Sequence, residues 1–103
     1  MPLANKKCIP CEGGTQPLKR GEIGKLLKEI PEWGLEENKI KRIFKFQNFA
    51  QAMEFVNKVA ELAEQEGHHP DIGIRYSRVT LVLWTHAIGG LSENDFILAA
   101  KAN

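Results

Sequence analysis

The stretch NFAQAMEFVNKVAELAEQEGHHP, residues 48–70, carries the strongest structural signal in the chain. Its apolar residues recur at steps of three and four, the spacing of one face of an α-helix. They are Phe49, Ala52, Met53, Val56, Val59, Ala60 and Ala63. Asn48 is a preferred N-cap residue with Gln51 three positions later, and Gly67 can take the left-handed conformation that ends a helix. The sequence therefore predicts the main core helix from Asn48 to Glu66.

Two adjacent histidines, His68 and His69, follow this helix directly. Pro70 favours an extended backbone at His69, so we expect the two imidazoles to diverge. Histidine exchanges protons near neutral pH, and a helix C-terminus stabilises the protonated ring. Glu64 lies one turn before His68, and we expect its carboxylate to reach toward that ring. A solvated turn that happens to hold two histidines explains the local sequence equally well.

The segment before the main helix predicts a short helix and two strands. Residues 22–30 place apolar side chains on one helical face, and Pro31 ends that helix. Trp33 follows, to cover the helix end or to wall a ligand pocket. Residues 35–46 are rich in β-prone residues and predict two short strands. Residues 1–17 are rich in proline and glycine and predict an irregular N-terminal arm.

The segment after the histidine pair predicts a second pair of strands and a last helix. Residues 72–77 alternate between apolar and polar, and residues 79–86 are dense in large apolar residues, as in a central strand buried on both faces. His86 then lies where that strand ends. Ser92 is an N-cap residue with Asp95 at the third helical position, where an acid stabilises a helix start.

These elements predict an α+β fold, a four-stranded antiparallel sheet with three helices packed on one face, in the order α-β-β-α-β-β-α. Residues 18–103 form this single domain, preceded by the arm of residues 1–17. A sheet this small leaves an edge strand bare, and pairing with a second subunit would cover it. We therefore expect a homodimer or homotetramer.

The composition fits one ordinary globular domain of 103 residues, 43% hydrophobic and 26% charged. The net charge is only +1, so we expect no nucleic-acid partner. Basic and aromatic residues do alternate over residues 39–46, and we interpret them as the solvated face of a sheet. A nucleic-acid surface is the alternative.

The sequence predicts no membrane association, because no apolar run approaches the roughly 20 residues of a spanning helix. Residues 1–7 lack the apolar core of a signal peptide. We therefore expect a cytoplasmic protein, or an organellar one if a leader has been removed.

Cys8 and Cys11 form one CxxC motif. A redox pair normally opens a helix after a strand, whereas Gly13 and Gly14 follow closely here. A structural zinc site needs four ligands, and no second pair has suitable spacing. A structural or incidental role is favoured over a metal or redox role, and the role of the pair stays open.

The histidines belong to a longer pattern. Its spacing is Glu64-x3-His68-His69-Pro70-x5-Tyr76-x9-His86-x8-Asp95. This pattern resembles the signature of pterin-4a-carbinolamine dehydratases (4a-hydroxytetrahydrobiopterin dehydratases). Trp33 after the first helix, the run from Phe44 to Phe49, and Thr85-His86-x3-Gly90-Leu91-Ser92 resemble that family as well.

The resemblance implies an α+β fold and dimers that often pair into tetramers. It implies a hydro-lyase that removes water from 4a-hydroxytetrahydrobiopterin to give quinonoid dihydropterin, in the recycling of tetrahydrobiopterin, without a metal or other cofactor. It implies that His68, His69 and His86 are catalytic. His68 and His86 would donate protons near the 4a-hydroxyl, and His69 would orient the ring. It implies substrate-binding or orienting roles for Glu64, Gly67, Trp84, Thr85, Ala87, Asp95 and Trp33.

Two departures from the family bear on substrate preference. Asp71-Ile72 follows Pro70 where many relatives place an aromatic residue, and Trp84 stands where some relatives carry a small polar one. Other functions on the same fold stay open: a dimerisation cofactor for a partner protein, as some relatives are, or an accessory role in molybdopterin metabolism. A metal site built from the three histidines is a further alternative.

Overall fold

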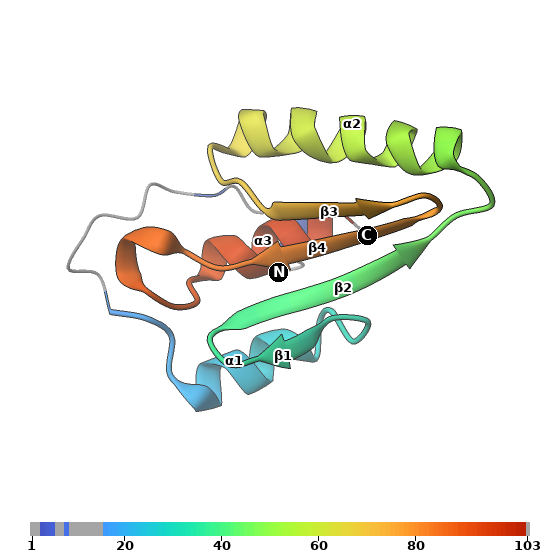
Figure 1. The fold of residues 1–103 in the computed structure, drawn as a ribbon. Coiled ribbons are helices and arrows are strands. Elements are labelled where there is room, and N and C mark those ends of the chain that lie inside the picture. The colour runs from blue at the N-terminus through green and yellow to red at the C-terminus, as the bar shows by residue number, and fades with distance from the viewer. Residues whose placement is uncertain (1–2, 6–7, 9–15, 103) are drawn as a thin grey trace.

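The computed structural model describes residues 3–5, 8 and 16–102 (Figure 1). Most of the expected N-terminal arm, including Cys11, lies outside these residues. The elements in chain order are the 3-10 turn η1 (Leu3–Asn5), α1 (Arg20–Leu27), β1 (Gly34–Glu36), β2 (Lys39–Lys45), α2 (Phe49–Glu66), β3 (Asp71–Arg75), β4 (Arg78–Leu83), the 3-10 turn η2 (His86–Ile88) and α3 (Glu93–Ala102). Within the described ranges, no helix is long and apolar enough to cross a membrane.

The four strands form one antiparallel sheet in the order β1-β2-β4-β3. In its register, Val79 of β4 lies opposite Phe44 of β2 on one side and Ile74 of β3 on the other. Helix α3 lies behind the sheet, between α2 at the top of Figure 1 and α1 at the bottom. The expected α+β class and the order of helices and strands are confirmed.

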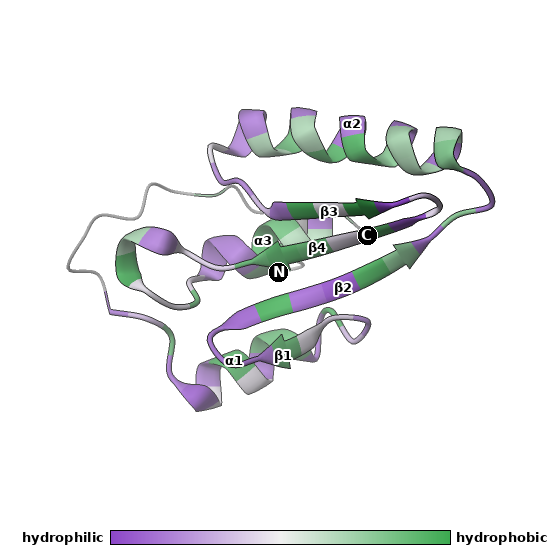
Figure 2. Ribbon diagram, viewed as in Figure 1, coloured by the Kyte–Doolittle hydropathy of each residue, from purple (hydrophilic) through white to green (hydrophobic). Residues whose placement is uncertain are grey.

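The core lies between the sheet and the helices. Val79, Leu81 and Leu83 of β4 are buried and pack in one hydrophobic cluster with α3, in which Phe96 is fully buried. Figure 2 shows β4 and α3 as mainly hydrophobic, whereas β2 alternates between hydrophilic and hydrophobic residues. Leu3 of the arm is also in this cluster, at 2% exposure. The arm therefore contributes to the core of the domain.

The expectation that the central strand is buried on both faces is wrong. Thr80 and Val82 are half-buried and Arg78 is exposed, because these side chains point to the face away from the helices. The apolar density of residues 79–86 therefore reflects one buried face and one partly solvated face.

Helix α2 matches its prediction within one residue. Asn48 caps it by accepting a hydrogen bond from the Gln51 N–H at 2.9 Å, and Gly67 ends it in the left-handed region at φ 65° and ψ 26°. Helix α1 is shifted relative to the expected residues 22–30. It ends at Leu27, and a turn then carries Ile30 into the core.

Strand β4 is shorter than predicted. It ends at Leu83, and His86 lies in η2. The Thr85 N–H donates to the Gly90 carbonyl at 2.8 Å, which folds the chain back on itself before His86. The third histidine therefore sits on a tight turn beyond the sheet.

Candidate active site

A cavity of about 410 Å³ opens at the end of the sheet where α2 stops and β4 leaves the sheet. This volume lies in the range of small-molecule sites. The cavity is formed by the segment after α2, the segment after β4 and the first turn of α3. Its lining residues are Gly67, His68, His69, Pro70, Asp71, Trp84, Thr85, His86, Ala87 and Asn94.

His68 and Asp95 form a mostly buried polar contact at the cavity wall. The imidazole Nε2 lies 2.6 Å from Asp95 Oδ1, with 12% of the His68 side chain and 0% of the Asp95 side chain exposed. An ionised carboxylate only accepts hydrogen bonds, so Nε2 carries the proton of this contact. That leaves Nδ1 as the nitrogen that can exchange a proton with a ligand.

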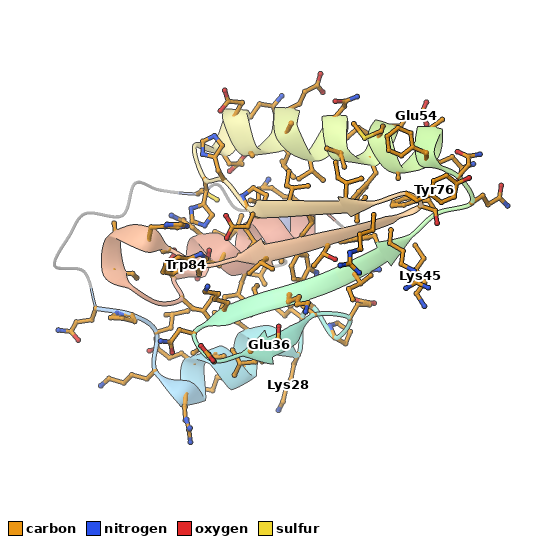
Figure 3. All side chains as sticks on the ribbon, viewed as in Figure 1. Lys28, Glu36, Lys45, Glu54, Tyr76 and Trp84 are labelled. Atoms are coloured by element: carbon orange, nitrogen blue, oxygen red, sulfur yellow. The ribbon has the colours of Figure 1, made fainter. Side chains whose placement is uncertain are left out.

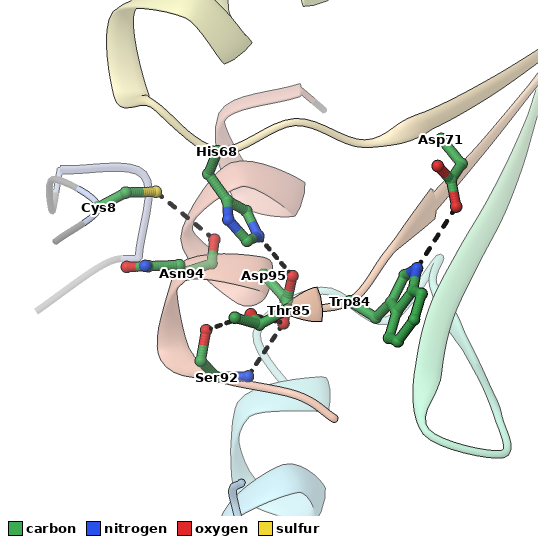
Figure 4. A network of polar contacts seen from close by, with 8 residues as sticks. All are labelled: Cys8, His68, Asp71, Trp84, Thr85, Ser92, Asn94 and Asp95. Carbon is green, nitrogen blue, oxygen red and sulfur yellow. Dashed lines mark hydrogen bonds and ion pairs between the residues drawn. The ribbon is translucent and has the colours of Figure 1, made fainter. Parts of the chain in front are cut away.

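Asp95 is held in place by two further donors at its other oxygen. Oδ2 accepts from the Ser92 N–H and from the Thr85 hydroxyl, both at 2.9 Å (Figure 4). Thr85 gives its only hydroxyl proton to Asp95, so the Ser92 hydroxyl donates to Thr85 Oγ1 at 2.7 Å. The carboxylate therefore has a fixed orientation, and it fixes the His68 ring in turn.

His69 has a different and more exposed partner. Its Nε2 lies 2.6 Å from Glu64 Oε2, with 62% and 78% of the two side chains exposed. The expectation that the two imidazoles diverge is confirmed. The expectation that Glu64 reaches toward His68 is wrong, because His68 turns to Asp95 and leaves Glu64 to His69.

His86 lies on an aromatic platform. Its ring is stacked on Trp84, with centroids 3.9 Å apart and planes inclined by 32°. The Lys39 ammonium lies 4.6 Å from the centre of the indole, and the indole N–H donates to Asp71 Oδ2 at 3.4 Å. The indole thus joins β2, the start of β3 and the turn that carries His86.

Three histidines around one small-molecule cavity, on this fold, agree with the family expected from the sequence. A family model described as pterin 4 alpha carbinolamine dehydratase matches residues 16–103. The chain belongs to this family. Residue 8 and its neighbours in the arm precede the matched range.

Curated relatives of the dehydratase family align over nearly the whole chain. A provisionally named pterin-4-alpha-carbinolamine dehydratase of Rickettsia canadensis is 52% identical, over 96% of this chain and 93% of that protein. A relative of the same provisional name from Rubrobacter xylanophilus is 46% identical, over 98% and 95%. A solved structure, called a transcriptional coactivator/pterin dehydratase, from Brucella melitensis has a TM-score of 0.82 and 33% identity, over 85% of this chain and 96% of that one.

Most of the residues singled out from the sequence lie at the cavity. Gly67, Trp84, Thr85 and Ala87 line it together with the three histidines. Glu64 and Asp95 stand behind His69 and His68 as their hydrogen-bond partners.

Two residues of the expected pattern lie elsewhere. Trp33 is 5% exposed and packs edge-on against Phe44 at 6.1 Å, within the core cluster. It takes the covering role foreseen for it and is absent from the cavity lining. Tyr76 forms the β3–β4 turn, and Figure 3 shows it at the end of the sheet opposite Trp84.

Sequence reasoning did not assign a site role to Asn94 or Ser92. Asn94 lines the cavity, and Ser92 holds Asp95 and Thr85. The available signal was their place close to Asp95 at the start of α3. No group of three His, Cys, Asp or Glu side chains that could hold a metal ion occurs in the part of the chain that the structure describes.

Proposed function

We propose that this chain is a 4a-hydroxytetrahydropterin dehydratase, a hydro-lyase that uses histidines as general acids and bases. The substrate would be 4a-hydroxytetrahydrobiopterin or a close pterin, and the product quinonoid dihydropterin. The reaction would serve the recycling of a pterin after aromatic amino acid hydroxylation. No cofactor enters this reaction.

The proposed step balances without any further reagent. The C4a–O bond breaks with its electron pair on oxygen, and a protonated imidazole gives that oxygen its proton, so that water leaves. The N5 lone pair forms the C4a=N5 double bond, and the N5 proton passes to a base. His68 and His86 would act as donors, and His69 would orient the ring and share the role of base.

The buried His68–Asp95 pair is the observation that carries this proposal. A ring fixed through Nε2 can lose and regain a proton at Nδ1 without changing its orientation. The buried carboxylate lies 2.6 Å from Nε2 and holds the orientation of the ring through this cycle. A correctly placed acid or base of this kind supplies about 10²–10⁴-fold in rate.

The test follows the dehydration of a freshly generated 4a-hydroxytetrahydropterin. Wild-type protein should accelerate the reaction over buffer, and His68→Ala and His86→Ala should each lower kcat by about 10²-fold or more. Lys45→Ala is the matched control, because Lys45 is exposed at the end of the sheet opposite Trp84 (Figure 3).

Two results would contradict the proposal in different ways. Wild-type protein that leaves the buffer rate unchanged would rule out the dehydratase function. Full activity in both histidine variants would preserve the function and rule out the histidine mechanism.

A further inference from the structure

Glu66, the last residue of α2, is a mostly buried carboxylate outside the cavity lining. Its side chain is 11% exposed. Oε1 accepts a hydrogen bond from the Cys8 backbone N–H at 2.8 Å, and Oε2 lies 3.9 Å from Lys101 Nζ in the last turn of α3. One carboxylate therefore touches the N-terminal arm and α3 from the end of α2.

Cys8 extends this connection to the first turn of α3. Its thiol donates to the Asn94 carbonyl at 3.6 Å. Burial, and then the neighbouring Glu66 carboxylate, raise the pKa of the Cys8 thiol to about 12, so the sulfur keeps the proton that it donates. The same shift makes the thiol a poor nucleophile at neutral pH.

Both contacts lie next to the His68–Asp95 pair in the chain. Glu66 is separated from His68 by Gly67 alone, and the His68 N–H donates to the Ala63 carbonyl at 3.2 Å, which ties the histidine backbone to the end of α2. Asn94 directly precedes Asp95. Figure 4 shows the Cys8–Asn94 contact beside the His68–Asp95 contact.

The arm also has an anchor away from the cavity. Leu3 is 2% exposed within the core cluster, and η1 packs against α3. The described residues of the arm thus contact α3 at Leu3 and both α2 and α3 at Cys8. A segment anchored in this way restrains the distance between the two helix ends that carry the pair.

We propose that Glu66 is a positioning residue for His68 and Asp95, and that it acts by fastening the N-terminal arm across the ends of α2 and α3. The predicted effect on kcat rests on the proposed dehydratase function. The structural reason for the proposal is that the 2.6 Å contact between His68 and Asp95 joins two residues 27 positions apart in the chain, and this contact must be held by the packing around it. A misplacement of about 1 Å costs up to about 10²-fold in catalysis.

The test compares Glu66→Ala, Glu66→Gln and the control Glu61→Ala, an exposed residue of the same helix. Glu66→Ala should lower kcat about tenfold and change KM less, because it loosens the His68–Asp95 pair and substitutes no residue of the cavity lining. Glu66→Gln should recover most of kcat, because its amide oxygen still accepts from the Cys8 N–H. Glu61→Ala should match wild type.

A second readout does not depend on activity. In protein labelled with ¹⁵N at histidine, the His68 Nε2 proton should exchange slowly with water, because Asp95 accepts its hydrogen bond and the side chain is 12% exposed. Its exchange should be faster in Glu66→Ala and unchanged in Glu61→Ala. Faster exchange in a protein without dehydratase activity would leave the positioning role standing and reject only the proposed function.

Opposite results would overturn the positioning role. A folded Glu66→Ala with wild-type kcat and wild-type exchange would do so, and so would a Glu66→Gln as impaired as Glu66→Ala. Should Glu66→Ala not fold, Glu66→Met decides, because it fills a similar volume and leaves the Cys8 N–H without its carboxylate acceptor. Unchanged kcat and exchange in that variant would reject the proposal.

Discussion

Asp95 does two jobs with one carboxylate. Through Oδ2 it caps the start of α3 by accepting from the Ser92 N–H, and through Oδ1 it holds His68. The sequence pattern predicted the cap, which is a local contact over three residues. The pairing with His68 joins residues far apart in sequence, and only the resemblance to a family suggested that the two are connected.

Asp95→Asn should separate the two jobs. The amide oxygen can still accept both hydrogen bonds at the Oδ2 position, but its NH₂ then faces the Nε2 proton of His68, which is left without an acceptor. We expect kcat to fall by about 10²-fold and the free energy of unfolding to fall by about 1–3 kcal/mol. Dehydration kinetics and urea unfolding measure the two effects. A variant with wild-type kcat would show that the carboxylate serves α3 alone.

Cys8 should make the stability of the protein depend on alkaline pH. Its pKa is raised from 9.0 to about 12 in the folded state, so above pH 9 the unfolded chain releases this proton first. The contribution is complete below pH 9 and is lost as the pH rises toward 12. Urea unfolding at pH 7 and pH 10 should therefore show a larger loss for wild type than for Cys8→Ala. Equal losses would mean that the thiol is solvated.

At the scale of the element, α2 shows what local sequence can specify. The predicted apolar face is only partly buried, because Ala52, Val59 and Ala63 are buried whereas Phe49 is 49% exposed. Asn48 and Gly67 fix both ends of the helix through contacts within a few residues, and both ends were predictable. Which carboxylate each histidine meets was not. Glu64 is the sequence neighbour of both rings, yet α3 brings Asp95 to His68, and that depends on the packing of whole elements.

Gly67→Ala should destabilise the end of α2 by backbone strain alone. A Cβ at this position would meet nothing within 4 Å, but φ is +65°, and an L-residue there costs about 1–2 kcal/mol. Gly24→Ala is the control, since Gly24 lies inside α1 with equal space and no positive φ, and alanine should stabilise it by about 0.5–1 kcal/mol. Urea unfolding should therefore show a lower free energy of unfolding for Gly67→Ala and a higher one for Gly24→Ala. Equal changes in the two variants would contradict the strain argument.

At the scale of the whole molecule, the cavity forms where the ends of several helices and strands lie next to one another. The end of α2, the exit of β4 and the start of α3 come together at one end of the sheet (Figure 1), and Cys8 contacts the ends of both helices. The order of helices and strands was predictable from periodicity and turn residues. The burial of Leu3 and the anchoring of Cys8 were not, because nothing periodic in residues 1–17 indicates where an irregular segment packs.

The sheet as a whole should extend through β3 into a second copy of the chain. β3 is an edge strand with Ile72 and Ile74 exposed at 38% and 40%, whereas the other edge strand has only three residues. Long apolar edges favour pairing, and a charge on the edge prevents it. Ile74→Lys should therefore halve the mass measured by sedimentation or light scattering relative to wild type.

Ile43→Lys is the matched control, because Ile43 is 50% exposed on the inner strand β2 and should leave the assembly intact. A monomeric wild-type protein, or dissociation in both variants, would contradict pairing through β3.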